Sequence, residues 1–456
     1  MREVIVLALV FVAVAAPAAA QDAASLQNEI RELRRQLDAV NQQYQKAIDA
    51  LTERLKRLES APAPVTAAPP PSPATVPPTA PGATTPAGDR PVTAQDLVRP
   101  REPFSLTERR APGQLLFDMG IVADFIGNLA GRDADKADRG TFAGRENRFF
   151  PREIEVNMYG RIDPYAQGVV RFEFAEEFDD GERALEVALA EAHFTLLTLP
   201  FGTRATLGLQ PVRFGLLSHL HREALPQPDT PHVLLRFIGE EQFRESGAEL
   251  AWIPPLPIYL EALVGIFNGD NETSFGRGSL FGSPLVTGRL RTFFETESLG
   301  ALQIGVSGAS GENEDRHRTT LAGVDLKYKL IPEGWRHPVF TIGAEGILSR
   351  RDTDDRDRTL DRFGWYTWAE IQPWKRWLGG VRYDWTELPL DPGREWAIEP
   401  YLGFLPSDFL RFRLAYKHTE RSHHDAWVSN GVTARTVDEL LLQATFFLGA
   451  HQGHPF

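Results

Sequence analysis

The chain has 456 residues and a formal net charge of −13 at pH 7, and it contains no cysteine. This acidic balance argues against nucleic acid as a partner, because phosphate backbones require clustered lysine and arginine. Without cysteine, disulfides, zinc ribbons, iron–sulfur clusters and thiol nucleophiles are excluded.

The first twenty residues have the parts of a secretory signal peptide. The stretch 1–20 begins with Arg2, continues in an apolar run over 4–16 and ends in three alanines, so cleavage is predicted before Gln21. The alternative is an N-terminal membrane anchor, for which the apolar run is short. No run of 18 apolar residues follows, so the sequence predicts an exported chain without a membrane-spanning helix.

Residues 21–60 predict a helix with a narrow apolar stripe. From Leu26 to Leu58 the apolar residues recur at spacings of three and four, with one stutter at Tyr44. This stripe predicts a coiled coil between copies of the chain, and the alternative is a helix that packs on the chain's own body. The next segment, 61–112, is rich in proline, alanine and threonine and predicts an extended linker.

From residue 113 to residue 456, short runs alternate apolar and polar side chains between glycine, proline, aspartate and asparagine. Clear examples are "GVVRFEF" (168–174), "GGVRYDW" (379–385) and "FLRFRLAYKH" (409–418). A period of two is typical of strands with two different faces, and the segment 113–456 holds about sixteen of them. The sequence therefore predicts an all-β domain of antiparallel strands.

The connections between these runs alternate in length. The predicted tight turns include 163–164, 199–202 and 254–257, and the predicted long loops are 127–149, 215–242, 268–284, 308–318, 349–361 and 419–435. Transmembrane barrels have short turns on one side and long loops on the other, and closure leaves no sheet edge in lipid. About sixteen strands enclose a lumen too wide for side chains to fill, so the polar faces are predicted to point inward. The apolar run 440–448 is predicted to pair with the first strand.

This register places charges of both signs in the lumen. The expected basic, pore-lining residues are Arg161, Arg171, Arg204, Arg289, Arg291, Lys327, Lys329, Arg382, Arg411, Arg413 and Lys417. The expected acidic residues are Glu153, Glu155, Glu173, Glu261, Asp325, Glu345, Glu370, Asp384 and Glu399. The two sets nearly balance, so they predict little ion selectivity, and pairs across strands would stabilise a wet wall.

Signatures of catalysis and of cofactor binding are missing from the sequence. It contains no G-x-S-x-G, H-E-x-x-H, P-loop or dinucleotide fingerprint, and the prediction is therefore no enzyme and no cofactor.

One long connection, "FGLLSHLHREALPQPDTPHVLLRFIGEE" (214–241), contains several groups that bind zinc in other proteins. They are His219, His221, Glu223, Asp229 and His232. His219 and His221 are two positions apart and would share one face of an extended chain. The other interpretation is a loop that folds into the lumen and narrows it, which would be polar for that reason alone.

The order of signal, coiled coil, linker and sixteen-stranded barrel resembles the phosphate-selective porin O and P family and its outer-membrane relatives. The stretch 185–231 is most similar to the relatives, with a strand hairpin around "LPFG", a glycine-containing strand and a histidine-containing loop. The resemblance implies lumenal bases that draw anions inward, here Arg411, Arg413 and Lys417. Some relatives are labelled as receptors for metal uptake.

Three functions remain open from the sequence. The first is an outer-membrane porin, a homotrimer in outer-membrane lipid, through which small solutes or ions diffuse passively, with anion preference as an option. The second is a barrel for zinc uptake or binding through His219 and His221. The third is an envelope tether whose periplasmic coiled coil contacts peptidoglycan.

Overall fold

The computed structural model describes residues 117–449 except 132–144, 180–181, 241, 272, 277, 297–299, 333, 354–357 and 423–433. The predicted signal peptide (1–20), coiled coil (21–60) and linker (61–112) lie outside the described residues. The strands are β1 (Phe117–Ala130), β2 (Arg148–Arg161), β3 (Ala166–Asp179), β4 (Glu182–Leu199), β5 (Thr203–Pro211), β6 (Arg244–Trp252), β7 (Tyr259–Phe267), β8 (Leu285–Thr296), β9 (Gly300–Glu312), β10 (Arg318–Leu330), β11 (Val339–Asp352), β12 (Thr359–Trp374), β13 (Trp377–Glu387), β14 (Arg394–Ser407), β15 (Leu410–Ser422) and β16 (Thr436–Gly449). The helical segments are η3 (Pro200–Gly202), η4 (Arg222–Ala224) and α3 (His232–Phe237). None of the helices in the described part of the chain has the length and apolar character needed to cross a membrane.

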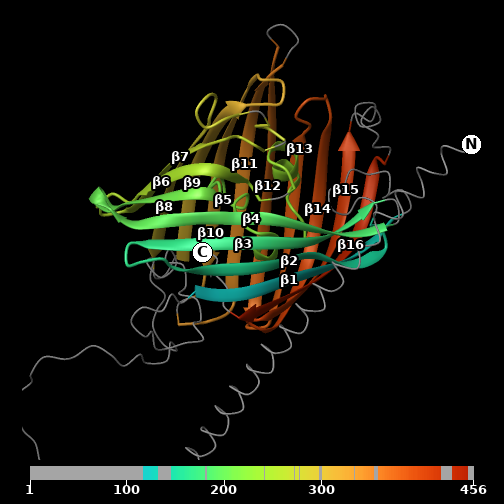
Figure 1. Ribbon diagram of the computed structural model, residues 1–456. Coiled ribbons are helices and arrows are strands. Elements are labelled where there is room, and N and C mark those ends of the chain that lie inside the picture. The colour runs from blue at the N-terminus through green and yellow to red at the C-terminus, as the bar shows by residue number, and fades with distance from the viewer. Residues whose placement is uncertain are drawn as a thin grey trace, which may run out of the picture. The chain divides into compact units, whose positions relative to one another are not determined.

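The sixteen strands form one closed antiparallel barrel in which each strand pairs with its neighbours in the chain. The closing ladder joins β1 to β16, from Gly120 opposite Gly449 to Ala130 opposite Glu439. In Figure 1 the strands β1 to β4 cross those of the far wall at a steep angle, as strand tilt in a barrel requires. The predicted all-β antiparallel barrel, its strand number and the pairing of the last strand with the first are confirmed.

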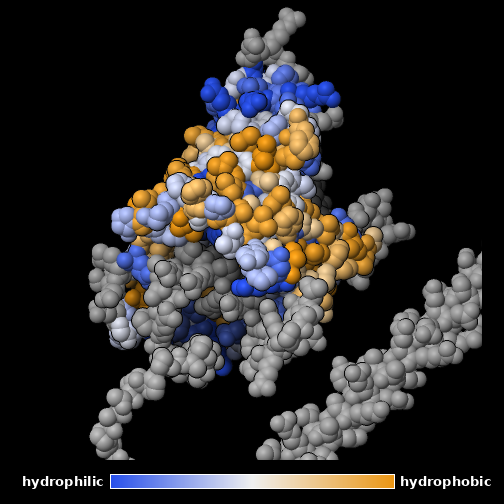
Figure 2. Space-filling view, turned by 60° about the vertical axis from the view of Figure 1, so that its left-hand side comes forward, coloured by the Kyte–Doolittle hydropathy of each residue, from blue (hydrophilic) through white to orange (hydrophobic). Residues whose placement is uncertain are grey.

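The two faces of the barrel wall differ in polarity. On β10, Val324 is 60% exposed on the outside, whereas the neighbouring Asp325 is 1% exposed and faces the interior. Figure 2 shows a broad hydrophobic surface on the outer wall, with hydrophilic residues gathered beyond it at one end. The predicted orientation, with apolar side chains outward and polar ones inward, is therefore confirmed.

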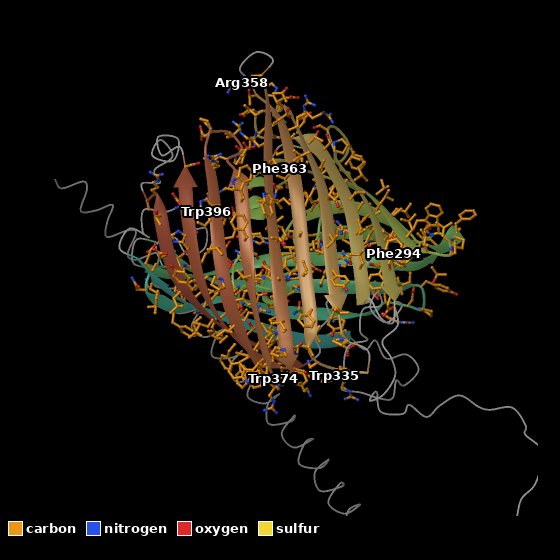
Figure 3. The ribbon with its side chains drawn as sticks, turned by 180° about the vertical axis from the view of Figure 1, so that it is seen from behind. Phe294, Trp335, Arg358, Phe363, Trp374 and Trp396 are labelled. Atoms are coloured by element: carbon orange, nitrogen blue, oxygen red, sulfur yellow. The ribbon has the colours of Figure 1, made fainter. Side chains whose placement is uncertain are left out.

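Large aromatic side chains lie on the outer wall toward both of its ends. Trp335 and Trp374, each 68% exposed, lie at the end with the short turns (Figure 3). Farther along the wall, the ring of Tyr383 lies 5.3 Å from that of Trp365 and 6.2 Å from that of Trp396. Amphipathic rings at two levels suit the two interfaces of a membrane.

Several connections are shorter than the sequence predicts. Only residues 313–317 join β9 to β10, in place of the predicted loop 308–318, and 353–358 join β11 to β12, in place of 349–361. The strands continue there on polar residues, as where Arg350 pairs with Asp361 across β11 and β12. These strand ends extend beyond the apolar belt and are polar, and for this reason the sequence pattern predicted loops there.

Part of the barrel interior is an apolar core. Residues 212–243, here called the lumen loop, contribute Phe214, Val233, Phe237 and Phe243 to it. The cluster also contains Phe275, from the connection between β7 and β8, and wall residues of β7 to β12; these are Phe267, Leu285, Ala309, Leu321, Ile347, Tyr366 and Trp368. Apolar side chains that face a water-filled lumen are stabilised when other apolar side chains shield them from water. The lumen loop shields this part of the wall.

Candidate functional site

The lumen loop is held to the wall near its start by one glutamate. The backbone N–H of Leu216 donates to Glu345 Oε2 at 3.0 Å, and the Tyr366 hydroxyl donates to the same oxygen at 2.6 Å. Gly215 has a φ of +60°, and a Cβ there would lie 1.7 Å from Glu345 Oε1. Glycine is required at this position, because a side chain would separate the loop from the carboxylate.

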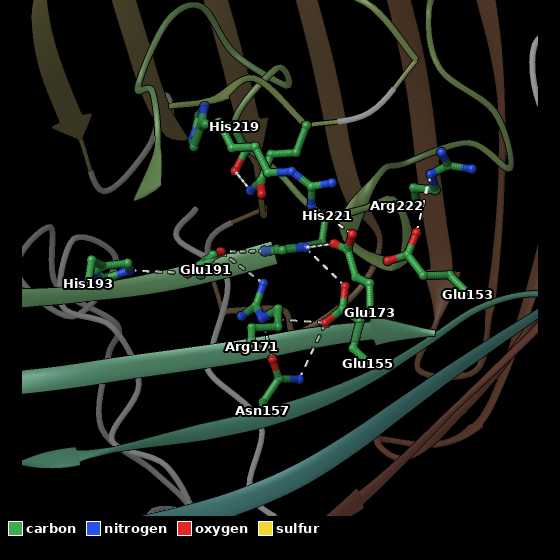
Figure 4. Close-up of polar contacts among 12 residues, drawn as sticks. Glu153, Glu155, Asn157, Arg171, Glu173, Glu191, His193, His219, His221 and Arg222 are labelled. Carbon is green, nitrogen blue, oxygen red and sulfur yellow. Dashed lines mark hydrogen bonds and ion pairs between the residues drawn. The ribbon is translucent and has the colours of Figure 1, made fainter. Parts of the chain in front are cut away.

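A second contact joins the lumen loop to β2, β3 and β4 through His221 (Figure 4). Its Nδ1 lies 2.9 Å from Glu155 and its Nε2 lies 2.6 Å from Glu191. Arg171 lies beside the same carboxylates, 3.6 Å from Glu155 and 3.1 Å from Glu191. A carboxylate beside each ring nitrogen favours the doubly protonated imidazolium form of this side chain.

The electrostatics of this contact agree with its geometry. Burial and Arg171 would lower the pKa of His221, but Glu155 and Glu191 outweigh them and raise that pKa well above its ordinary value. The next residue, Arg222, extends the contact, since its Nε lies 3.2 Å from Glu153.

A third contact joins the lumen loop to β13, β14 and β15 through Asp229. Arg382 donates to its Oδ1 at 2.7 Å and to its backbone carbonyl at 3.0 Å, and Lys417 donates to its other carboxylate oxygen. Arg382 is completely buried and also lies 2.9 Å from Asp384 and 2.8 Å from Glu399. Burial would raise the pKa of Asp229, but the two cations hold it strongly below its ordinary value.

These contacts carry the lumen loop across the barrel. Leu216 is bound at β11 and His221 at β2 and β4, on strands nearly opposite each other in the closed order. Five residues of backbone span at most about 18 Å, so the loop occupies the lumen between these walls. This geometry agrees with the interpretation of 214–241 as a loop that narrows the lumen.

The structure separates the two histidines that the sequence placed together. A turn at 217–220, closed by the Leu220 N–H on the Leu217 carbonyl, directs His219 away from His221 (Figure 4). Burial and three nearby arginines, foremost Arg289, lower the pKa of His219 well below its ordinary value. The side chains within 4.8 Å of one another that could share a metal are instead Glu153, Glu155, His221 and Glu223.

Apart from Arg161, the predicted pore-lining residues fall into two groups. Most lie beside acids: Arg289 bonds Asp325 at 2.8 and 3.0 Å, Arg291 bonds Glu261, and Arg204 lies 3.5 Å from Glu261. Arg171, Arg382 and Lys417 make the pairs described above, and Arg161 is exposed at the end of β2. The last four, Lys327, Lys329, Arg411 and Arg413, line one cavity of about 260 Å³.

This cavity, here called the basic pocket, lies at the short-turn end of the lumen, where Pro226 of the lumen loop faces it. Among the described residues that line it, Glu370 is the only one with a carboxylate. A second cavity, between the lumen loop and β2 to β4, has both signs in similar number. Its charged residues are Arg145, Arg152, Glu153, Glu173, Glu176, Glu186, His221, Arg222 and Arg244. The excess of positive charge is therefore local.

Sequence reasoning missed some of the residues that hold the lumen loop. Glu191 bonds His221, and Glu395 accepts a hydrogen bond from Arg236 of α3 at 2.7 Å. Both glutamates lie on inward-facing positions of strands, so the period-two pattern could have identified them. Their partners on the loop follow no such period and could not be matched to them.

Comparisons with known proteins support the fold. No family model matches the chain. An uncharacterized protein of Aquifex aeolicus (strain VF5) is 26% identical over 345 residues, covering 66% of this chain and 69% of the relative. The outer membrane channel DcaP of Acinetobacter baumannii, 12% identical, aligns with a TM-score of 0.50 over 74% of this chain and 97% of that chain. An anion-selective porin from Comamonas acidovorans, 8% identical, has a TM-score of 0.47 over 74% and 100%. The likeness to DcaP shows a shared barrel fold.

Proposed function

We propose that the chain is an outer-membrane porin through which small solutes and ions diffuse passively. The observation that carries this proposal is a closed barrel with an apolar outside and a charged inside, crossed by a loop that ion pairs hold in place. In a closed barrel every strand is paired on both sides, so the backbone N–H and C=O groups are hydrogen-bonded even in lipid. A barrel of sixteen strands is wide enough to enclose an aqueous lumen. The lumen loop would set the size limit for solutes.

An anion preference is part of the proposal. Four cations and one carboxylate line the basic pocket, whereas the second cavity has both signs. Rings or clusters of one sign raise the local concentration of counter-ions. Solutes on the short-turn side of the lumen loop therefore meet a positive field.

The relationship to the phosphate-selective porin O and P family remains a proposal, as does assembly into a homotrimer in the outer membrane. The predicted coiled coil at 21–60 would support such an assembly from the periplasm. Cross-linking of the full mature chain, compared with a chain lacking 21–60, tests the assembly. A monomer in both samples would contradict it.

Planar-bilayer recording tests the channel itself. We expect stepwise conductance in KCl and, under a KCl gradient, a reversal potential that corresponds to chloride preference. The variant Lys327→Gln/Lys329→Gln should move the reversal potential toward zero, and Arg204→Gln, a lumenal arginine outside the pocket, should not. A folded protein that never conducts refutes the porin proposal.

A second candidate function is zinc binding, favoured by the four ligand groups that lie together around His221. Zinc would have to replace the imidazolium proton, so binding should strengthen as the pH rises. Calorimetric titration of His221→Ala should show loss of zinc binding, and the matched variant His219→Ala should retain it. Equal zinc affinity in the two variants removes this candidate.

A further inference from the structure

The basic pocket has an apolar wall as well as its charges. Five apolar residues line it together with the cations; they are Pro226, Trp368, Leu378, Leu405 and Phe412. Such a wall does not help to bind a hydrated ion. Apolar surface forms no hydrogen bonds that could compensate the ion for the loss of its hydration water.

The apolar wall is rigid. The indole of Trp368 lies so close to Gly343 that a Cβ there would be 2.1 Å from its ring. The same indole stacks on Tyr366, with ring centroids 6.0 Å apart, and the Tyr366 hydroxyl is bound to Glu345. The indole is therefore fixed before any solute arrives, which lowers the entropy cost of binding.

Two of the cations are held in position as well. Arg413 donates to Gln443 Oε1 at 3.1 Å, and the Gln443 amide donates to Asp124 at 2.8 Å. The guanidinium of Arg411 lies 4.5 Å from the ring centroid of Phe447. Guanidinium groups with fixed planes suit the flat, two-oxygen geometry of a carboxylate.

The size of the pocket restricts the solute. Its volume of about 260 Å³ is below the 300–1,000 Å³ of sites for drug-sized ligands. A single ring or a short alkyl chain with one acidic group is the kind of solute that such a space can hold.

We propose that the basic pocket is a binding site for small organic carboxylates, whose charged end meets the cations and whose apolar body packs against Trp368 and Leu378. This proposal rests on the proposed channel function. Inorganic phosphate meets the charge requirement but cannot use the apolar wall, and a neutral arene uses the wall but not the charge. The cations and the apolar wall together favour small organic carboxylates over both of these solutes.

Permeability measured with benzoate, acetate, phosphate and chloride tests the proposal in planar bilayers. In a simple water-filled pore, permeability follows mobility, and benzoate passes more slowly than acetate. We expect the opposite order here, with a benzoate flux that saturates with concentration and is reduced by added benzoate but not by benzyl alcohol. An order that follows mobility, without saturation, overturns the proposal.

Two variants connect the effect to the pocket. Arg411→Gln should weaken benzoate and acetate alike, by roughly two- to fivefold, since one partly solvated charge contributes little more. Leu378→Gln, close in size, should weaken benzoate and leave acetate unchanged. Arg204→Gln is the control and should change neither, so equal effects of all three variants contradict the proposal.

The outcome remains distinguishable from a failure of the channel itself. Absence of conductance in KCl contradicts the porin function. Normal KCl conductance without discrimination between benzoate and acetate contradicts only the carboxylate site. Calorimetric titration of the detergent-solubilised full chain with benzoate gives a second measurement that requires no conduction, and equal weak heats for benzoate and acetate also count against the site.

Discussion

Replacing His221 by glutamine should release the lumen loop from β2 and β4. The Nδ1 of His221 lies 2.9 Å from Glu155, and its Nε2 lies 2.6 Å from Glu191. A glutamine amide is neutral and has one NH₂ group, so it cannot reach two carboxylates on opposite sides. The variant keeps the wall intact and removes only the loop's side of the contact.

The expected cost follows from burial. Removing one partner of a buried ion pair destabilises by about 3–5 kcal/mol, because the other charge stays buried. Arg171 still neutralises Glu155 and Glu191 in the variant, at 3.6 and 3.1 Å, so we expect the lower limit of about 3 kcal/mol. That energy changes the population of displaced loop by a factor on the order of 100.

Alkaline pH should have the same effect on the unmodified chain. The pKa of His221 is raised in the closed arrangement, where Glu155, Glu173 and Glu191 surround it. The stabilisation is therefore complete below the ordinary histidine pKa of about 6.5 and is lost as the pH rises through the raised value. Single-channel conductance should change between neutral and alkaline pH in the wild type and remain constant in His221→Gln.

A matched control separates the loop contact from general titration. His193 lies 3.1 Å from Glu191 but belongs to the wall strand β4, so His193→Gln should keep the pH response of the wild type. A wild-type conductance that does not depend on pH, or a His221→Gln channel with the same pH response, refutes the assignment of His221 as the releasable contact.

Three further outcomes are expected. Gly215→Ala should displace the lumen loop from Glu345, which gives larger conductance steps in planar bilayers and faster proteolysis of the loop. Tyr366→Phe removes a buried hydrogen bond to the same carboxylate and should lower the free energy of unfolding by about 1–3 kcal/mol in heat-modifiability assays. Arg382→Met leaves three acids beside one lysine and should prevent assembly of the barrel, whereas Arg350→Met, on the exposed end of the wall, should assemble normally and cost below about 1 kcal/mol.

The barrel could be predicted because the alternation of apolar and polar residues can be recognised within each strand separately. Alternation along a strand such as "FLRFRLAYKH" reports which face meets lipid and which meets water, and sixteen repeats of that rule determine the closed sheet. The ends of the strands could not be predicted in the same way. Above the apolar belt both faces are polar, as at Arg350 and Asp361, so strand and loop have the same composition there.

The sequence predicted where the lumen loop lies in the chain, but it did not predict which wall residues the loop contacts. Its length and position between two strands predicted an inward fold, yet its partners are set by contacts between residues far apart in the chain. Asp229 meets Arg382, more than 150 positions away, and His221 meets Glu155 while the neighbouring His219 turns toward arginines. Spacing alone suggested a pair of histidines, because an extended chain was the simplest assumption.

Salt should distinguish the two kinds of charge in this lumen. Screening acts on solvated groups within a Debye length, which falls from about 10 Å at 0.1 M to about 3 Å at 1 M salt, and acts much less on buried pairs. The His221 and Asp229 contacts are buried, so conductance divided by bulk conductivity should remain constant as KCl rises at neutral pH. Arg411 and Lys327 are partly exposed in their cavity, so chloride preference should decline over the same range. A loop that opens with salt alone would mean that solvated contacts hold it, and the pH response expected for His221 would then lose its physical basis.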